Sequence, residues 1–288
     1  MDRLPAGLKA SLRRSDWPLL LADLAGIVVV PLALAGLQFV GPPGLHDLLT
    51  FSSTEQTLHG LFGHWMVHYS GLLLLENAAG YLLFAGMGYL LARSIDERRW
   101  FWLSVATVLV VVPPVSALAS AWGFEVVAPE LAYRSRGASA VVAGVLGLLY
   151  AVGLGAICRT YDLRATISLG GAILVGALSI LLLRIGAGSQ SAALVLSGVA
   201  VAIVLFDATE RWIRNEEGLR LQLPSLAAAG SVSIAVFLLM GLAFPALFPA
   251  DPFTGTTITN VFAHATGFVL GVTIGIWGRR YWATGSWI

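Results

Sequence analysis

A serine and a histidine stand out in the sequence because each is a polar residue inside a long apolar run. Ser139 belongs to the stretch Gly137-Ala138-Ser139-Ala140 at the start of one run, and His264 lies within another. A histidine beside a serine can remove the hydroxyl proton as the oxygen attacks a peptide carbonyl, and can then return the proton to the leaving amine. Ser139 and His264 are therefore candidates for a catalytic dyad.

Asn77 lies in a third apolar run and carries a side-chain amide that can donate hydrogen bonds. Such a donor, together with the backbone N–H of Ser139, could stabilise the oxyanion that forms when the serine attacks. Each candidate also has a structural interpretation, because serine beside glycine is common in helix packing and asparagine can hydrogen-bond to a neighbouring helix. His264 is the least expected in that role, because ionisable groups inside hydrocarbon are costly and are usually functional.

His64 and His68 precede Asn77 with a spacing of four residues, which would suit two metal ligands on one helix. No third ligand follows at a recognised spacing, although His264 could complete a site in space. A metal site would leave Ser139 and Asn77 without a role, so we predict neither a metal nor another cofactor. A transporter that uses the same three histidines would need paired charges along a path, and the inner halves of the apolar runs carry almost none.

The composition is that of a membrane protein. Hydrophobic residues make up 57% of the 288 residues and charged residues 11%, whereas an ordinary soluble domain has about 25% charged residues. A segment in lipid must satisfy its own backbone hydrogen bonds, so apolar runs of ~20 residues predict helices. We therefore predict an all-α fold, a polytopic bundle of transmembrane helices. The net charge of +1 and the dispersed arginines do not indicate nucleic-acid binding.

Apolar runs between charged or Gly/Pro-rich breaks predict about eight membrane spans. They are Trp17 to Val40, Ser70 to Ala92, Phe101 to Ala121, Ala138 to Ile157, Ala165 to Leu183, Ser191 to Phe206, Leu226 to Leu247 and Thr257 to Trp277. We expect one membrane domain over residues 1–288, with an N-terminal segment 1–16, a bundle 17–277 and a tail 278–288. Cationic loops tend to stay cytoplasmic. If both termini are cytoplasmic, only Arg134, Arg136 and Arg184 of the 17 basic residues lie on or near the outer side.

In this orientation the spans with Asn77, Ser139 and His264 all run from outside to inside, and the three residues lie in the outer halves. Small residues follow the serine and the histidine at helical spacing: Ala143, Gly147, Gly267 and Gly271. Small residues on facing helices let two backbones approach closely in a bilayer. We therefore expect the Ser139 and His264 helices to pack tightly.

At these residues the sequence resembles the rhomboid family of intramembrane serine proteases. The family's marks occur in order: His64 and His68, Asn77 nine residues later, Gly137-Ala138-Ser139, and Ala263-His264-Ala-Thr-Gly267 followed by Gly271. The resemblance covers roughly the first four spans and the eighth. It implies a rhomboid-like bundle with a polar cavity open to the outer side, in which transmembrane protein substrates are cleaved near the outer face of the bilayer.

The resemblance also implies a role for each residue. Ser139 would be the nucleophile of this hydrolase and His264 its base, with no cofactor, and Asn77 would face the oxyanion. His64 and His68 would support the cavity and its loops, and Gly267 would be the close-packing glycine beneath the dyad. Sixteen arginines against one lysine indicate a GC-rich genome, which fits a prokaryotic plasma membrane.

Three positions differ from the family pattern. Leu73 stands where the family often has a second oxyanion-side histidine, Ala140 replaces the glycine after the serine, and Ala143 replaces an aromatic that packs on the catalytic histidine. The family core has six helices, so this chain is expected to contain an added pair before the last. The alternative function is a catalytically inactive rhomboid-like protein that binds transmembrane segments.

Overall fold

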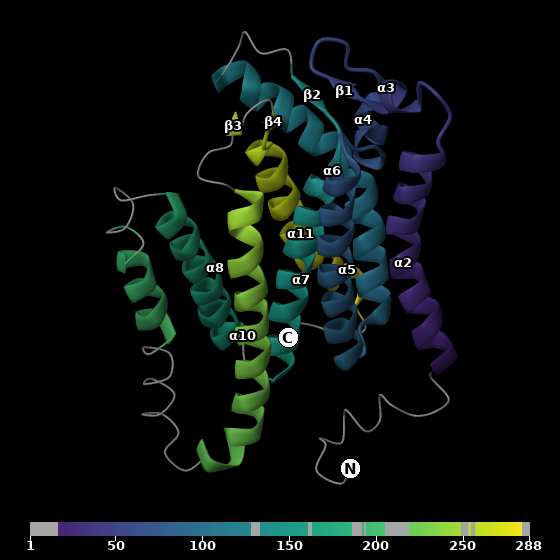
Figure 1. Cartoon of the computed structure of the whole chain (residues 1–288). Coiled ribbons are helices and arrows are strands. Elements are labelled where there is room, and N and C mark those ends of the chain that lie inside the picture. The colour runs from purple at the N-terminus through teal and green to yellow at the C-terminus, as the bar shows by residue number, and fades with distance from the viewer. Residues whose placement is uncertain are drawn as a thin grey trace. The chain divides into compact units, whose positions relative to one another are not determined.

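The computed structural model (Figure 1) describes residues 17–127, 133–160, 163–185, 192, 194–204, 219–248, 253–254, 257–258 and 259–283. The described chain falls into two compact units. Unit 1 holds the residues up to Ala151 and those from Phe262 onward to Ser286, and unit 2 holds Val152–Val261. A single domain over the whole chain stays a prediction.

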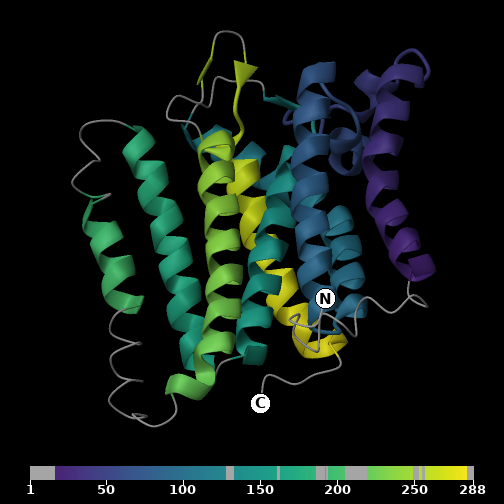
Figure 2. The same cartoon turned by 60° about the horizontal axis from the view of Figure 1, so that its bottom comes forward.

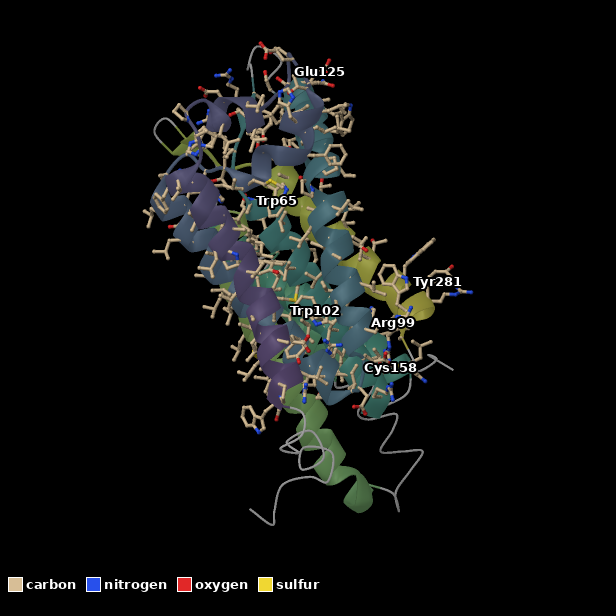
Figure 3. All side chains as sticks on the ribbon, turned by 90° about the vertical axis from the view of Figure 1, so that its right-hand side faces the viewer. Trp65, Arg99, Trp102, Glu125, Cys158 and Tyr281 are labelled. Carbon is tan, nitrogen blue, oxygen red and sulfur yellow. The ribbon has the colours of Figure 1, made fainter. Side chains whose placement is uncertain are left out.

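Unit 1 contains long helices and, at one end, a group of short elements. The long helices are α2 (Trp17–Val40), α5 (Gly71–Ser94), α6 (Arg98–Val127), the first part of α7 (Ser139–Thr160) and nearly all of α11 (Val261–Trp282). The short elements are α3 (Leu45–Leu49), β1 (Phe51–Ser52), α4 (Leu58–Gly63), the 3-10 helix η2 (His64–Met66) and β2 (Arg134–Ser135). Figure 3 shows Trp65 and Glu125 toward the end with the short elements, and Arg99 and Tyr281 toward the other end.

Unit 2 contains α8 (Leu163–Ile185), helical residues 194–204, α10 (Leu219–Leu247) and a hairpin of β3 (Phe253–Thr254) and β4 (Thr257–Ile258). A Cβ on Gly176 would lie 2.8 Å from the ring of Phe237, and one on Gly241 would lie 2.9 Å from Ile180. The residue numbers rise together in these two contacts, so α8 and α10 run in the same direction.

Six helices in the described part of the chain are long and apolar enough to cross a membrane: α2, α5, α6, α7, α8 and α11. Residues 194–204 and 231–247 form shorter apolar helices. The predicted all-α, polytopic fold therefore fits the structure. The count of eight stays a prediction, because the side chains of the sixth and seventh predicted spans are described only in part.

The helix α6 is longer than predicted and contains two prolines, Pro113 and Pro114, in its interior. A proline cannot donate a helical hydrogen bond, so backbone carbonyls near it lose their partners. Two serine hydroxyls after the prolines bond to other carbonyls of the helix: Ser116 Oγ donates to the Pro113 carbonyl at 3.0 Å, and Ser120 Oγ donates to the Ser116 carbonyl at 2.6 Å.

The helix α7 packs closely against both α5 and α11. A Cβ on Gly80 would lie 2.9 Å from Val142, and Cβ atoms on Gly267 and Gly271 would overlap the carbonyl oxygens of Ala140 and Gly144. A Cβ on Gly88, further along α5, would lie 4.0 Å from Leu149 Cα, further along α7. Residue numbers therefore rise together in both helix pairs, so α5, α7 and α11 run in the same direction, as Figure 2 illustrates for α7 and α11. This confirms the predicted close packing and the shared direction of the three helices.

Candidate active site

The segment before Ser139 lies against the residues that lead into α5. Gly137 has φ +124°, a conformation that side chains disfavour and glycine adopts readily. Its N–H donates to the His64 carbonyl at 3.0 Å, and the next N–H, of Ala138, donates to His68 Nε2 at 3.2 Å. The structure therefore brings the predicted residues Gly137, His64 and His68 together.

Both histidines are buried, with 3% of His64 and 1% of His68 exposed. His64 Nδ1–H donates to the Gly60 and Leu61 carbonyls, each at 3.2 Å. His68 Nε2 accepts a hydrogen bond, so its ring is neutral and carries its proton on Nδ1. Burial lowers the pKa of His64 to about 4, and burial, followed by the charge of His46, lowers the pKa of His68 to about 4. Both rings are therefore neutral at physiological pH and support the loop.

The pairing of His64 and His68 as metal ligands on one helix is not formed. The helix η2 ends at Met66, and Val67 is extended with φ −121° and ψ 152°, so the two rings do not share a helical face. Across the residues that the structure describes, no three histidine, cysteine, aspartate or glutamate side chains gather into a group that could hold a metal ion.

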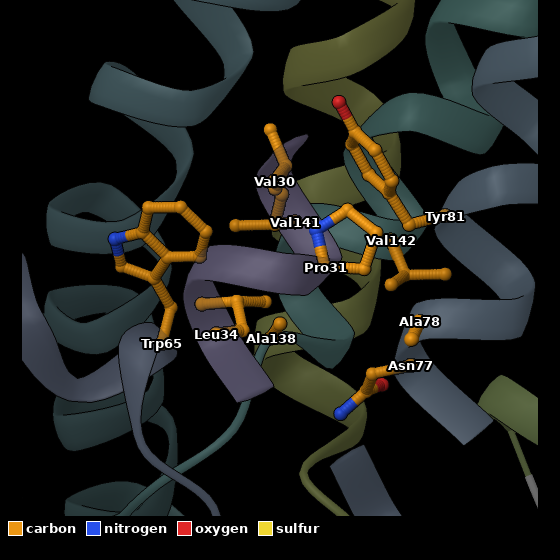
Figure 4. A pocket seen from close by; sticks show the side chains of 10 residues that line it. All are labelled: Val30, Pro31, Leu34, Trp65, Asn77, Ala78, Tyr81, Ala138, Val141 and Val142. Atoms are coloured by element: carbon orange, nitrogen blue, oxygen red, sulfur yellow. The ribbon is translucent and has the colours of Figure 1, made fainter. Parts of the chain in front are cut away.

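Asn77 lies on the buried face of α5 with 6% of its surface exposed. Its Nδ2 has no hydrogen-bond partner in the structure, and it would lie 3.8 Å from a Cβ placed on Gly137. Together with Tyr81 it lines a small cavity between α2, η2, α5 and α7, where its Nδ2 points away from the Tyr81 hydroxyl (Figure 4). A buried amide donor is thus free beside the segment that carries Ser139.

Ser139 is the first residue of α7 and is half-buried, whereas His264 on α11 is 4% exposed. Ala140 meets Gly267 across the two parallel helices. Since the helical rise is about 1.5 Å per residue, Ser139 and His264 lie within about 3 Å of the same level along the helix axes. Within the described residues no hydrogen bond joins the Ser139 hydroxyl to His264. Catalytic hydrogen bonds are often long without substrate and shorten when it binds.

Gly267 and Gly271 are required by the packing, because any Cβ there would meet backbone atoms of α7. The same holds for Gly147, whose Cβ would overlap the Phe268 carbonyl oxygen. A larger residue at these positions would separate the helices that carry Ser139 and His264.

Leu73 occupies the position at which the family pattern often has a histidine. Its Cδ2 would lie 3.5 Å from a Cβ on Gly137, closer than Asn77 Nδ2 at 3.8 Å. An apolar side chain therefore lies beside Gly137 together with Asn77. Ala143 is fully buried in α7, with 0% exposed.

Sequence reasoning missed two partners of this segment. Gln38 Oε1 accepts a hydrogen bond from the His68 backbone N–H at 2.9 Å, and Arg136 binds the region of Asp47 and Thr50. The only sequence signal for Arg136 was its place among the few basic residues predicted on the outer side.

Comparison of the chain with protein-family models, with curated proteins and with solved structures finds no match.

Proposed function

We propose that this protein is a rhomboid-type intramembrane serine endopeptidase that cleaves transmembrane segments of membrane proteins near the outer face of the bilayer. The observation that supports this most is the parallel packing of α7 and α11, in which Gly267 meets Ala140 and Gly271 meets Gly144. That packing holds the ends of the two helices that carry Ser139 and His264 close together. The rhomboid-like fold, the eight spans, the prokaryotic plasma membrane and the cytoplasmic termini belong to the same proposal.

The proposed reaction begins when Ser139 Oγ attacks the scissile carbonyl and His264 accepts the hydroxyl proton. The oxyanion then accepts hydrogen bonds from Asn77 Nδ2, which has no other partner, and from the Ser139 backbone N–H. The C–N bond breaks as His264 returns the proton to the amine, and water later hydrolyses the acyl-enzyme by the same route. With Leu73 in place of a donor, turnover is expected to be about 10² to 10³ times lower than with a full oxyanion site.

A second candidate is a catalytically inactive relative that binds transmembrane segments. It is favoured by Leu73, which packs near Gly137 where a donor is expected. This candidate keeps the fold and the cavity but not the activated serine.

The two candidates are separated by labelling the purified, detergent-solubilised protein with a fluorophosphonate probe, which phosphonylates activated serines. We expect wild type to label, and Ser139→Ala and His264→Ala to lose labelling while retaining the wild-type melting temperature. Ser94→Ala is a matched control, because Ser94 is exposed at the far end of α5 and its loss should leave labelling unchanged. Absence of labelling in wild type, beside an active rhomboid control, would favour the inactive relative.

A further inference from the structure

The five residues before Ser139 are each hydrogen-bonded to the segment 47–69. Arg134 and Ser135 form the strand β2, which pairs with β1 in the register Phe51 to Ser135 and Ser52 to Arg134. Tyr69 Oη–H also donates to the Arg134 carbonyl at 3.1 Å. Beyond β2, the Gly137 and Ala138 N–H groups donate to His64 and His68, as described above. The remaining residue of the five is Arg136.

Arg136 makes the most polar contacts of any side chain in this segment. Its Nε donates to Thr50 Oγ1 at 2.5 Å, and its Nη2 donates to Asp47 Oδ1 at 2.6 Å. Its guanidinium also lies over the Tyr69 ring, 5.4 Å from the centroid. Only 17% of the Arg136 side chain is exposed, although Asp47 is 84% exposed.

The geometry suits arginine and no other side chain. A planar guanidinium can present two N–H groups to separate acceptors and stack on an aromatic ring at the same time, whereas a lysine ammonium is a point charge that cannot do both. Thr50 Oγ1 itself donates to the His46 carbonyl at 2.6 Å. Its position is therefore fixed, and so is the acceptor that it offers to Arg136.

We propose that Arg136 is a positioning residue for Ser139, resting on the proposed function above. Arg136 fixes the backbone directly before Gly137, which is the one residue of the segment with a positive φ. The direction in which the Ser139 N–H and Oγ point follows from that backbone. Arg136 adds two hydrogen bonds and a ring contact to the single bonds that Gly137 and Ala138 each make. Without the arginine, glycine's conformational freedom would return to the residue two positions before the nucleophile. Arg136 does not touch the reacting atoms.

The Arg136–Asp47 ion pair is not expected to stabilise the whole fold. Because Asp47 is exposed, its attraction for Arg136 is screened by water and contributes little to global stability. A positioning role instead predicts a local effect, confined to the segment 134–139 and to the reactivity of the serine.

The test uses the full-length protein in detergent and compares wild type with Arg136→Gln, Arg136→Lys and Arg134→Gln. Arg134 is the matched control, since it has the same charge two residues away and is exposed. Two quantities are measured: the fluorophosphonate reaction resolved into a maximal rate and an apparent affinity, and amide hydrogen exchange of the peptide containing residues 134–139. A fourth variant, Thr50→Val, removes one acceptor without changing the segment itself.

We expect Arg136→Gln to lower the maximal labelling rate at least tenfold with an apparent affinity within twofold of wild type. Exchange in the peptide of residues 134–139 should become at least tenfold faster, while peptides of α5 exchange as before. Arg136→Lys and Thr50→Val should lie between, and Arg134→Gln should match wild type. If Arg136→Gln does not fold, the labelling rate and the hydrogen exchange of Thr50→Val test the role of Arg136 in its place.

Each outcome is assigned to one proposal. Unchanged labelling and unchanged exchange in Arg136→Gln would overturn the role of Arg136. Equal changes in Arg134→Gln would overturn it as well, because loss of any positive charge would then suffice. If wild type does not label, the proposed protease function fails, and exchange that accelerates in Arg136→Gln alone would still support the anchoring of the segment.

Discussion

Two of the regions of unit 1 that bury polar side chains differ in how completely those side chains are hydrogen-bonded. The first is centred on Asp23 of α2, which is 4% exposed. Its carboxylate accepts hydrogen bonds from Arg98 at 2.5 and 2.6 Å, from Tyr89 at 2.7 Å and from Trp102 at 3.0 Å. Trp102 lies beside α2 in Figure 3. These contacts join α2, α5 and α6.

The second region surrounds Gly137 and leaves donors unused. The side-chain atoms Asn77 Nδ2 and His68 Nδ1 are buried and have no hydrogen-bond partner. An unsatisfied buried donor costs about 1 to 3 kcal/mol, so proteins keep few of them, and those that persist call for an explanation. A group that must bind a developing charge has to be free beforehand. The Asp23 cluster, whose carboxylate is fully hydrogen-bonded, therefore stabilises the fold. The Asn77 and His68 donors, which have no partner, are suited to binding a ligand.

The largest effect that separates the two regions is expected from Asn77→Ala. If Asn77 is an oxyanion donor, its loss should lower the fluorophosphonate labelling rate by about 10² to 10³. The melting temperature should stay the same or rise, because an unsatisfied buried donor is removed. Both are measured on one detergent preparation. A labelling rate within threefold of wild type would remove Asn77 from the proposed mechanism.

The opposite pattern is expected for Asp23→Asn. The neutral amide cannot pair with Arg98 and cannot accept from all of its present donors, so the free energy of unfolding should fall by about 2 to 3 kcal/mol. We place the value below that for a fully buried pair because 49% of the Arg98 side chain is exposed and can reach water. Thermal unfolding measures the loss. Labelling at a temperature where the variant is folded should be unchanged, and a selective loss of labelling would mean that the cluster also supports the site.

A smaller effect is expected from pH. The pKa of buried His68 is about 4 in the folded protein, whereas an unperturbed histidine has a pKa of about 6.5. The unfolded chain therefore binds more protons between these values, so stability should fall as pH falls from about 6.5 towards 4. At pH 5 the loss is about 2 kcal/mol for one such histidine.

The variant His68→Gln tests this, since glutamine can accept from the Ala138 N–H and does not titrate. Its melting temperature should fall less than that of wild type between pH 7.5 and pH 5. The exposed His59 provides the control, because His59→Gln should keep the wild-type pH dependence. Equal pH dependence in all three proteins would mean that His68 is not held neutral by the fold.

The sequence predicted the parts of this structure that depend on local pattern. Apolar length located α2, α5 and α7 closely, and small-residue spacing predicted the contacts of Gly267 and Gly271. Both follow from periodicity along a single helix.

Contacts between residues far apart in sequence could not be predicted in that way. Arg136 and Asp47 are 89 residues apart, and Arg98 and Asp23 are 75 apart, so their pairing depends on how helices and loops assemble. The sequence also suggested a shared helical face for His64 and His68. The extended backbone at Val67 separates them, because a 3-10 helix rarely runs beyond three or four residues.

The mildest expected change adds to the unsatisfied region. Leu73 lies one helical turn before Asn77 on α5 and approaches Gly137, so Leu73→His would place a second donor near the proposed oxyanion. We expect the labelling rate to rise about tenfold. This gain is smaller than the roughly 10² to 10³-fold loss on removing an established donor, because no neighbouring side chain holds the new imidazole in place. Leu73→Phe is the control for size, and it should not accelerate the reaction. Faster labelling of Leu73→His but not of Leu73→Phe would show that the serine is activated and that the site lacks a donor. If neither variant nor wild type labels, the inactive, segment-binding protein is favoured.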